Sequence, residues 1–177
     1  MKLDESILDQ FDLNPQMERE PVNVMKISEL LDFLKESSER LIKKSKLFFT
    51  SEDADVQLDC MDVVATRLND FAQAFMDMVI FIRKEEGSYN GHSTSLRYCV
   101  TSYDTLSIEQ TDDEKKFLSE LLLRNEITHD YFNREIHQQK LISMMQNCMA
   151  GSQDAYEHLK EYCVSHTLLD KYINRSR

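Results

Sequence analysis

Glycine and proline, the residues that most often break or end helices, are scarce in this chain. Only 3 glycines and 2 prolines occur among its 177 residues, and Pro15 and Pro21 both lie near the N-terminus. All-β folds and doubly wound α/β folds contain many turns, which these two residue types usually supply. The sequence therefore predicts an all-α fold, and the chain is long enough to bury one sizeable core.

Hydrophobic residues recur every three or four positions in the first half of the chain, as on the buried face of a helix. This spacing predicts one helix over residues 24–49 and a second from the acid-rich start at Ser51 to about Glu86. Two of the three glycines lie between Gly87 and Gln110, where we expect a loop with one short helix near Leu96–Tyr103. Residues 1–22 are expected to form an N-terminal arm outside a single domain of residues 23–177.

Residues typical of helix starts and helix ends also occur in the second half of the chain. Thr111-Asp-Asp-Glu114 is a capping box, which predicts a helix that continues through Phe117 to Tyr131. Asn133 can cap a following helix, and Gly151-Ser152 is expected to separate that helix from a last one. The expected architecture is a helical bundle of four long helices with additional short helices.

The charge and the cysteines restrict what the chain can bind and where it resides. Lys and Arg total 21 against 32 Asp and Glu, a formal net charge of −11, so RNA could bind only at a local site. The longest stretch without a charged residue, Leu141–Gln153, is too short and too polar to span a bilayer. No N-terminal signal segment is present, so we expect a cytoplasmic protein without membrane attachment. Four cysteines without C-x-x-C spacing are expected to be reduced core residues: Cys60, Cys99, Cys148 and Cys163.

A cluster of cations lies near the end of the first predicted helix, at Arg40, Lys43 and Lys44. Cations are favoured at helix C-termini because they interact with the helix dipole, which is the structural interpretation of this cluster. The alternative is that the three side chains contact RNA phosphates.

The most informative segment has the pattern R-N-x-x-x-H-x-Y and contains Arg124, Asn125, His129 and Tyr131. On a continuous helix, Asn125 and His129 would lie about 40° apart, whereas Arg124 and His129 would be separated by about 140°. A single straight helix therefore does not direct Arg124 and His129 at one small group. A shared site needs a second copy of the motif or a bent helix end, which favours a homodimer with the motif at its two-fold axis.

An arginine and a histidine without a fixed metal can cleave RNA through its own 2′-hydroxyl group. Histidine exchanges protons near neutral pH, and a guanidinium group stabilises the extra negative charge on a pentacoordinate phosphate. Two copies of the pair would supply a base, an acid and two cations. The structural alternative is an exposed Arg124, a capping His129 and a packed Tyr131.

Other chemistries find less support in the sequence. Glu126 and His129 match the Glu-x-x-His element of di-iron bundles, but no second such element occurs. The chain has no glycine-rich phosphate loop and no G-x-S-x-G elbow, which argues against ATP-dependent and serine-hydrolase activities. We expect neither a metal nor a cofactor. The remaining histidines lack partners at metal-ligand spacing and are expected to be exposed or to cap helices: His92, His137, His158 and His166.

The segment from Arg124 to Phe132, within a helical bundle, resembles the HEPN superfamily, and in particular the HEPN toxin of HEPN/minimal-nucleotidyltransferase toxin–antitoxin pairs. The resemblance covers about Phe117–Met145 and, beyond that, only the order of helices. It implies a metal-independent endoribonuclease with Arg124 and His129 as catalytic residues in a homodimer cleft and Asn125 as a supporting polar residue.

The resemblance also implies a regulatory partner. In this branch a nucleotidyltransferase antitoxin silences the toxin by attaching AMP to the tyrosine of the motif, here Tyr131. This chain departs from the compact toxins in its length, its N-terminal arm, its Gly87–Gln110 insertion and its acidity. Some HEPN proteins are not nucleases, so the alternative is a non-catalytic helical module that binds a nucleotidyltransferase or another protein.

Overall fold

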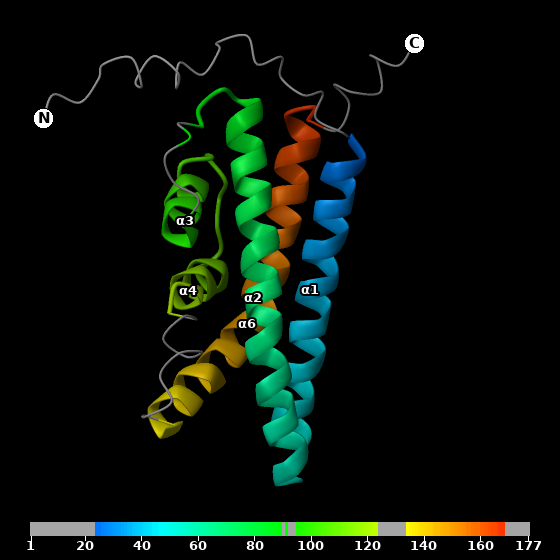
Figure 1. Ribbon diagram of the computed structural model, residues 1–177, viewed down its shortest axis with the longest axis vertical. Helices are drawn as coiled ribbons and strands as arrows, with labels where there is room; N and C mark the ends of the chain where they lie inside the picture. The colour runs from blue at the N-terminus through cyan, green and yellow to red at the C-terminus, as the bar shows by residue number, and fades with distance from the viewer. Residues whose placement is uncertain (1–23, 90, 92–94, 124–133, 169–177) are drawn as a thin grey trace, which may run out of the picture.

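The computed structural model describes residues 24–89, 91, 95–123 and 134–168, and these residues form helices without any strand. Three helices are long and two are short: α1 (Val24–Thr50), α2 (Ala54–Glu85), α3 (Leu96–Asp104), α4 (Asp112–Leu121) and α6 (Arg134–Ser165). In Figure 1 the later, orange part of α6 runs beside α1 and α2, its first, yellow part runs obliquely behind α2 to the lower left, and α3 and α4 lie along one side of α2. The all-α prediction is therefore confirmed, with three long helices in the described residues instead of four. The predicted arm, residues 1–22, lies outside them.

The helix starts follow the capping residues in the sequence. Asp53 caps α2, since its side chain accepts hydrogen bonds from the backbone N–H groups of Asp55 and Val56. Ser95 caps α3 in the same way, which confirms the short helix expected in the Gly87–Gln110 segment. At the other end of α2, Gly87 has a φ of +71°, the left-handed conformation that glycine adopts most readily after a helix.

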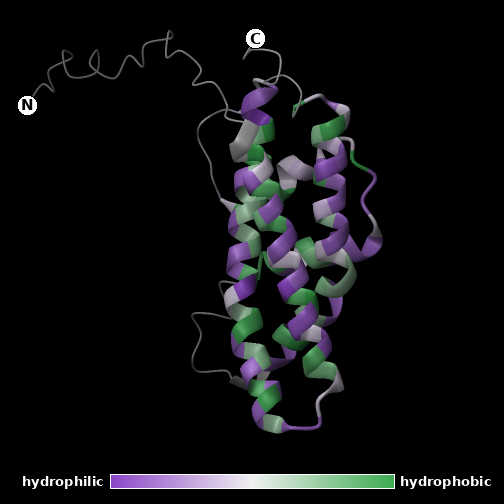
Figure 2. Cartoon of the chain, turned by 90° about the vertical axis from the view of Figure 1, so that its right-hand side faces the viewer, coloured by the Kyte–Doolittle hydropathy of each residue, from purple (hydrophilic) through white to green (hydrophobic). Residues whose placement is uncertain are grey.

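Aromatic side chains hold the two short helices against α2. The ring centroids of Phe71 on α2 and Phe117 on α4 are 5.2 Å apart, and those of Phe75 on α2 and Tyr103 on α3 are also 5.2 Å apart. Both pairs meet edge to face, the geometry that the charge distribution of aromatic rings favours. All four rings are fully buried. Figure 2 shows hydrophobic and hydrophilic residues alternating along the long helices, as expected for helices that bury one face.

Small polar side chains line the contact between α1 and α6. Ser38 and Ser152 share a hydrogen bond of 2.8 Å between their hydroxyl groups, and Ser45 Oγ lies 3.3 Å from Cys148 Sγ. The three serines are buried, so these contacts satisfy polar atoms that would otherwise lose their partners on folding. The small side chains let α1 and α6 run close together.

Gly151 was expected to end a helix, and this prediction is wrong, because α6 continues through it from Arg134 to Ser165. The glycine instead lies where α4 packs closely against α6. A Cβ atom built on Gly151 would lie 2.5 Å from Phe117 Cβ and 2.6 Å from the backbone oxygen of Asp113. No side chain fits at this position. The close packing of α4 against α6 that the glycine permits offsets the roughly 1 kcal/mol that a glycine costs inside a helix.

Gly151→Ala should destabilise the protein even though alanine is the better helix former. The added methyl group must displace the backbone of α4, and such overpacking typically costs about 1–3 kcal/mol. Chemical denaturation should therefore show a lower free energy of unfolding. Alanine at the exposed Gln146 of the same helix is the control and should leave stability within about 0.5 kcal/mol. An unchanged or higher stability of Gly151→Ala would contradict the close approach.

The helix predicted from Phe117 to Tyr131 ends at Leu121, which corrects the sequence prediction. The backbone N–H groups of Leu122 and Leu123 both bond back to the carbonyl oxygen of Glu120, and this tightens the last turn. No glycine or proline marks this end, so the local sequence offered no stop signal there.

Candidate functional site

The four residues of the predicted nuclease motif, Arg124, Asn125, His129 and Tyr131, lie outside the described residues. The angle between Arg124 and His129 therefore stays a prediction. The structure does describe the two helices on either side of the motif, α4 up to its end at Leu121 and α6 from its start at Arg134. How these helices are held determines where the ends of the motif segment are fixed.

The start of α4 is attached to α6 and α3 through a buried polar cluster. Glu114 is fully buried, and its carboxyl group accepts a hydrogen bond of 2.5 Å from the Tyr103 hydroxyl group. The other carboxyl oxygen of Glu114 lies 2.7 Å from His158 Nδ1, on α6. Burial, followed by the charge of Glu114, raises the pKa of Tyr103, so this hydroxyl group stays protonated and remains a donor. The three side chains thus link α3, α4 and α6.

This cluster corrects two expectations from the sequence. The capping box forms only in part, because Thr111 Oγ accepts a 3.1 Å hydrogen bond from the Glu114 N–H while the Glu114 side chain points into the core. Thr111 also donates to Asp154 of α6 at 2.6 Å. His158, expected to be exposed or to cap a helix, is instead partly buried against Glu114. The two residues are 44 positions apart in the sequence, so no local pattern revealed the contact.

The end of α4 is fixed to α6 as well. Ser143 Oγ donates to one carboxyl oxygen of Glu120 at 2.9 Å, and Asn147 Nδ2 donates to the other at 2.7 Å. Leu121, one residue further on, is fully buried. Together with the contact at Gly151, these bonds clamp α4 along α6, so the chain enters and leaves the motif segment from two helices that hold each other.

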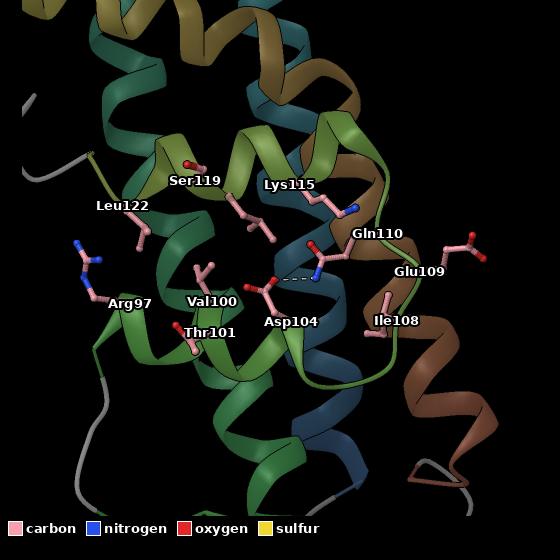
Figure 3. Close-up of a pocket in the computed structure, with 11 residues that line it drawn as sticks. Arg97, Val100, Thr101, Asp104, Ile108, Glu109, Gln110, Lys115, Ser119 and Leu122 are labelled. Atoms are coloured by element: carbon pink, nitrogen blue, oxygen red, sulfur yellow. Dashed lines mark hydrogen bonds between the residues drawn. The ribbon is translucent and has the colours of Figure 1, made fainter.

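A groove runs between α3 and α4 and is closed on one side by the loop that joins them. Its volume is about 580 Å³. Figure 3 shows Arg97 and Leu122 at one end of the groove and Lys115 and Gln110 at the other, with Val100 between them. No sequence pattern marks Arg97 or Lys115, because the groove exists only once α3 and α4 lie side by side.

A second cavity, of about 730 Å³, lies between the end of α2, the α3–α4 loop and the end of α6. Several of its polar side chains bond to one another. Arg83 donates to Glu86 at 3.0 Å and also to Thr105, and the Tyr162 hydroxyl group donates to Glu86. Burial and the bond to Glu86 raise the pKa of Tyr162 to about 12. These contacts tie the end of α2 to α3 and α6, so we interpret this cavity as structural.

The cations near the end of α1 are partly compensated by acidic residues. Arg40 pairs with Glu36 one turn earlier, and Lys44 lies 3.4 Å from Asp59 of α2. Lys43 is exposed. Exposed pairs of this kind contribute little to stability, so the side chains could exchange a carboxylate for another anion at small cost.

The four cysteines are buried and unpaired, as the sequence predicted. Burial raises the pKa of Cys99 and of Cys148 to about 11, and that of Cys163 to about 12. These three thiols therefore stay protonated near neutral pH and are poor nucleophiles.

Within the described ranges, no group of three or more histidine, cysteine or acidic residues is placed to hold a metal ion. None of the helices in those ranges combines the length and the apolar character that a membrane span needs. Comparison of the chain with models of known protein families, with curated proteins and with solved structures found no match.

Proposed function

We propose that this protein is a metal-independent endoribonuclease of the HEPN type, active as a homodimer and silenced by a nucleotidyltransferase antitoxin. The observation that carries the proposal is the motif R-N-x-x-x-H-x-Y, which stands between two helices of an all-α bundle. The arginine, the histidine and the tyrosine are the residue types that cleavage and its regulation need, at the spacing that the resemblance to HEPN toxins implies.

In the proposed reaction the 2′-hydroxyl group of RNA attacks the adjacent phosphorus atom. His129 of one protomer accepts the hydroxyl proton, and His129 of the other donates a proton to the departing 5′-oxygen. Arg124 stabilises the additional negative charge of the pentacoordinate phosphate, and Asn125 supports the site by hydrogen bonding. The products are a 2′,3′-cyclic phosphate and a free 5′-hydroxyl group, and no metal-bound water is required.

The contacts around α4 support this proposal because catalytic groups must be held in place by their surroundings. Glu114 and Glu120 attach both ends of α4 to α6, and Gly151 brings the two helices together between those points. The chain therefore leaves α4 and re-enters α6 at positions fixed relative to each other. Two flanking helices that are held together in this way are suited to position catalytic residues placed between them in the sequence.

The acidic surface requires that RNA be held by local cations. Arg40, Lys43 and Lys44 are the proposed phosphate contacts on α1. Lys43 is the most available of the three, since the other two pair with carboxylates. Electrostatic contacts to phosphate make binding salt-dependent, so RNA affinity should fall as ionic strength rises.

Cleavage of single-stranded RNA by the purified protein in EDTA tests the function directly. The proposal expects fragments without added metal, from a species that light scattering identifies as a dimer. The alternative is a non-catalytic helical module that binds a nucleotidyltransferase or another protein. Intact RNA beside a stable complex with such a partner would favour the module and contradict the nuclease.

Tyr131 is the proposed site of silencing. An AMP group there would add bulk and a negative phosphate next to the cations that bind RNA, so it would exclude the substrate. Intact mass spectrometry after co-expression with a cognate nucleotidyltransferase should show AMP-sized additions that are lost in Tyr131→Phe. Full silencing of a protein with unmodified mass would contradict this route, because the antitoxin would then act by covering the cleft.

A further inference from the structure

The groove between α3 and α4 has an apolar floor with a cation at each end. Val100, Ile108 and Leu118 supply apolar lining, and Thr101 and Ser119 supply hydroxyl groups. The groove volume of about 580 Å³ is within the range of about 300–1,000 Å³ that small-ligand sites occupy. It is therefore large enough for a short stretch of an extended ligand.

The cations of the groove lie at its two ends, and of its two acids one points away while the other accepts a hydrogen bond from a neutral amide and keeps its charge. Among the described residues, the side chains of Arg97 and Lys115 are exposed and form no hydrogen bond or ion pair. Asp104 accepts a 2.9 Å hydrogen bond from the side chain of Gln110, and Glu109 points away from the groove in Figure 3. In a chain with a net charge of −11, two exposed cations that have no partner among the described residues offer local contacts for an anionic ligand at the ends of the groove.

The groove also adjoins the predicted motif. Leu122 lines the groove and precedes Arg124 by two residues, so only about 7 Å of extended chain connects the groove wall to the motif. A strand lying in the groove would thus be near the residues proposed to cleave it.

We propose that the α3–α4 groove binds a segment of single-stranded RNA next to the cleavage site. Arg97 and Lys115 bind phosphates at the two ends, and a base lies against the apolar floor between them, with the hydroxyl groups of Thr101 and Ser119 at its edges. The separation of the two cations by an apolar surface favours a nucleic-acid strand over an acidic peptide. This inference deepens the nuclease proposal and rests on it for the position of the scissile bond.

Fluorescence anisotropy with a short labelled single-stranded RNA in EDTA tests the groove. The His129→Ala protein is used so that the RNA stays intact. Arg97→Gln and Lys115→Gln should each weaken binding about tenfold, since each removes a charge-assisted hydrogen bond to a phosphate. Lys116→Gln is the matched control, because Lys116 is the exposed neighbour on α4 that does not line the groove, and its affinity should change less than twofold. Lys115→Arg should retain binding.

The outcomes separate this inference from the nuclease proposal. If the wild-type protein cleaves RNA while both groove variants bind like Lys116→Gln, the groove does not bind RNA and the nuclease proposal is unaffected. If the wild-type protein leaves RNA intact but the groove variants lose affinity, the groove does bind RNA and the nuclease proposal is contradicted. An acidic peptide that displaces the RNA at equal concentration would overturn the choice of ligand, and so would displacement by inorganic phosphate. Circular dichroism confirms that each variant keeps its helical content.

Discussion

Replacing Arg124 or His129 by alanine is expected to abolish RNA cleavage. Loss of a general acid–base group typically lowers the rate by about 10²–10⁴, and loss of a group that stabilises the transition-state charge lowers it by about 10²–10³. The proposal also expects growth arrest on expression of the wild-type protein, and each variant should relieve it. The rate of RNA cleavage in EDTA measures the effect.

Two control variants distinguish a catalytic role from a general disturbance. Arg67→Ala and His166→Ala remove the same residue types from α2 and from the end of α6, where they contact Asp70 and Tyr162. Both controls should cleave RNA like the wild-type protein, and all four variants should keep their helical content. Cleavage at the wild-type rate by both Arg124→Ala and His129→Ala would refute the assignment of the motif.

Glu114→Ala is expected to have the largest effect on stability. It leaves two groups, the buried Tyr103 hydroxyl group and His158, without the carboxyl group that joins them, and a buried donor left without its partner typically costs about 1–3 kcal/mol. Urea denaturation should show a lower free energy of unfolding. Asp112→Ala is the control, because Asp112 is an exposed acid in the same helical turn, with an expected cost of about 0.3–1 kcal/mol.

A loss of stability in Glu114→Ala no larger than in Asp112→Ala would show that the buried cluster does not hold α4. Glu114→Gln adds a finer comparison, since its amide oxygen can still accept the bond from Tyr103. Its stability should therefore lie between those of the wild-type protein and Glu114→Ala.

The helices and most of their starts could be predicted from the sequence because they depend on local patterns. The capping residue Thr111 and the periodic hydrophobic residues of α1 and α2 act within one or two turns, and the structure confirms them. The role of Gly151 could not be predicted, because its neighbours in space belong to another helix. A glycine that ends a helix and a glycine that admits a neighbouring helix look the same in sequence.

The candidate site likewise contains residues that the sequence alone reveals and contacts that it does not reveal. The R-N-x-x-x-H-x-Y motif is a contiguous segment, so the sequence alone could reveal it. The pairing of Glu114 with His158 and the joining of Arg97 and Lys115 in one groove depend on how α3, α4 and α6 pack. Such contacts between distant segments follow from tertiary structure and leave no periodic signal in the sequence.

The chemistry of the RNA ends produced in EDTA tests the central claim most directly. Attack by the RNA's own 2′-hydroxyl group must leave a 2′,3′-cyclic phosphate on one fragment and a 5′-hydroxyl group on the other, which mass spectrometry of the fragments identifies. A substrate with a 2′-deoxy sugar at the cleaved position should remain intact. Fragments that carry 5′-phosphates, cleavage of the 2′-deoxy substrate, or RNA left whole by the wild-type protein would each contradict a metal-independent nuclease built on Arg124 and His129.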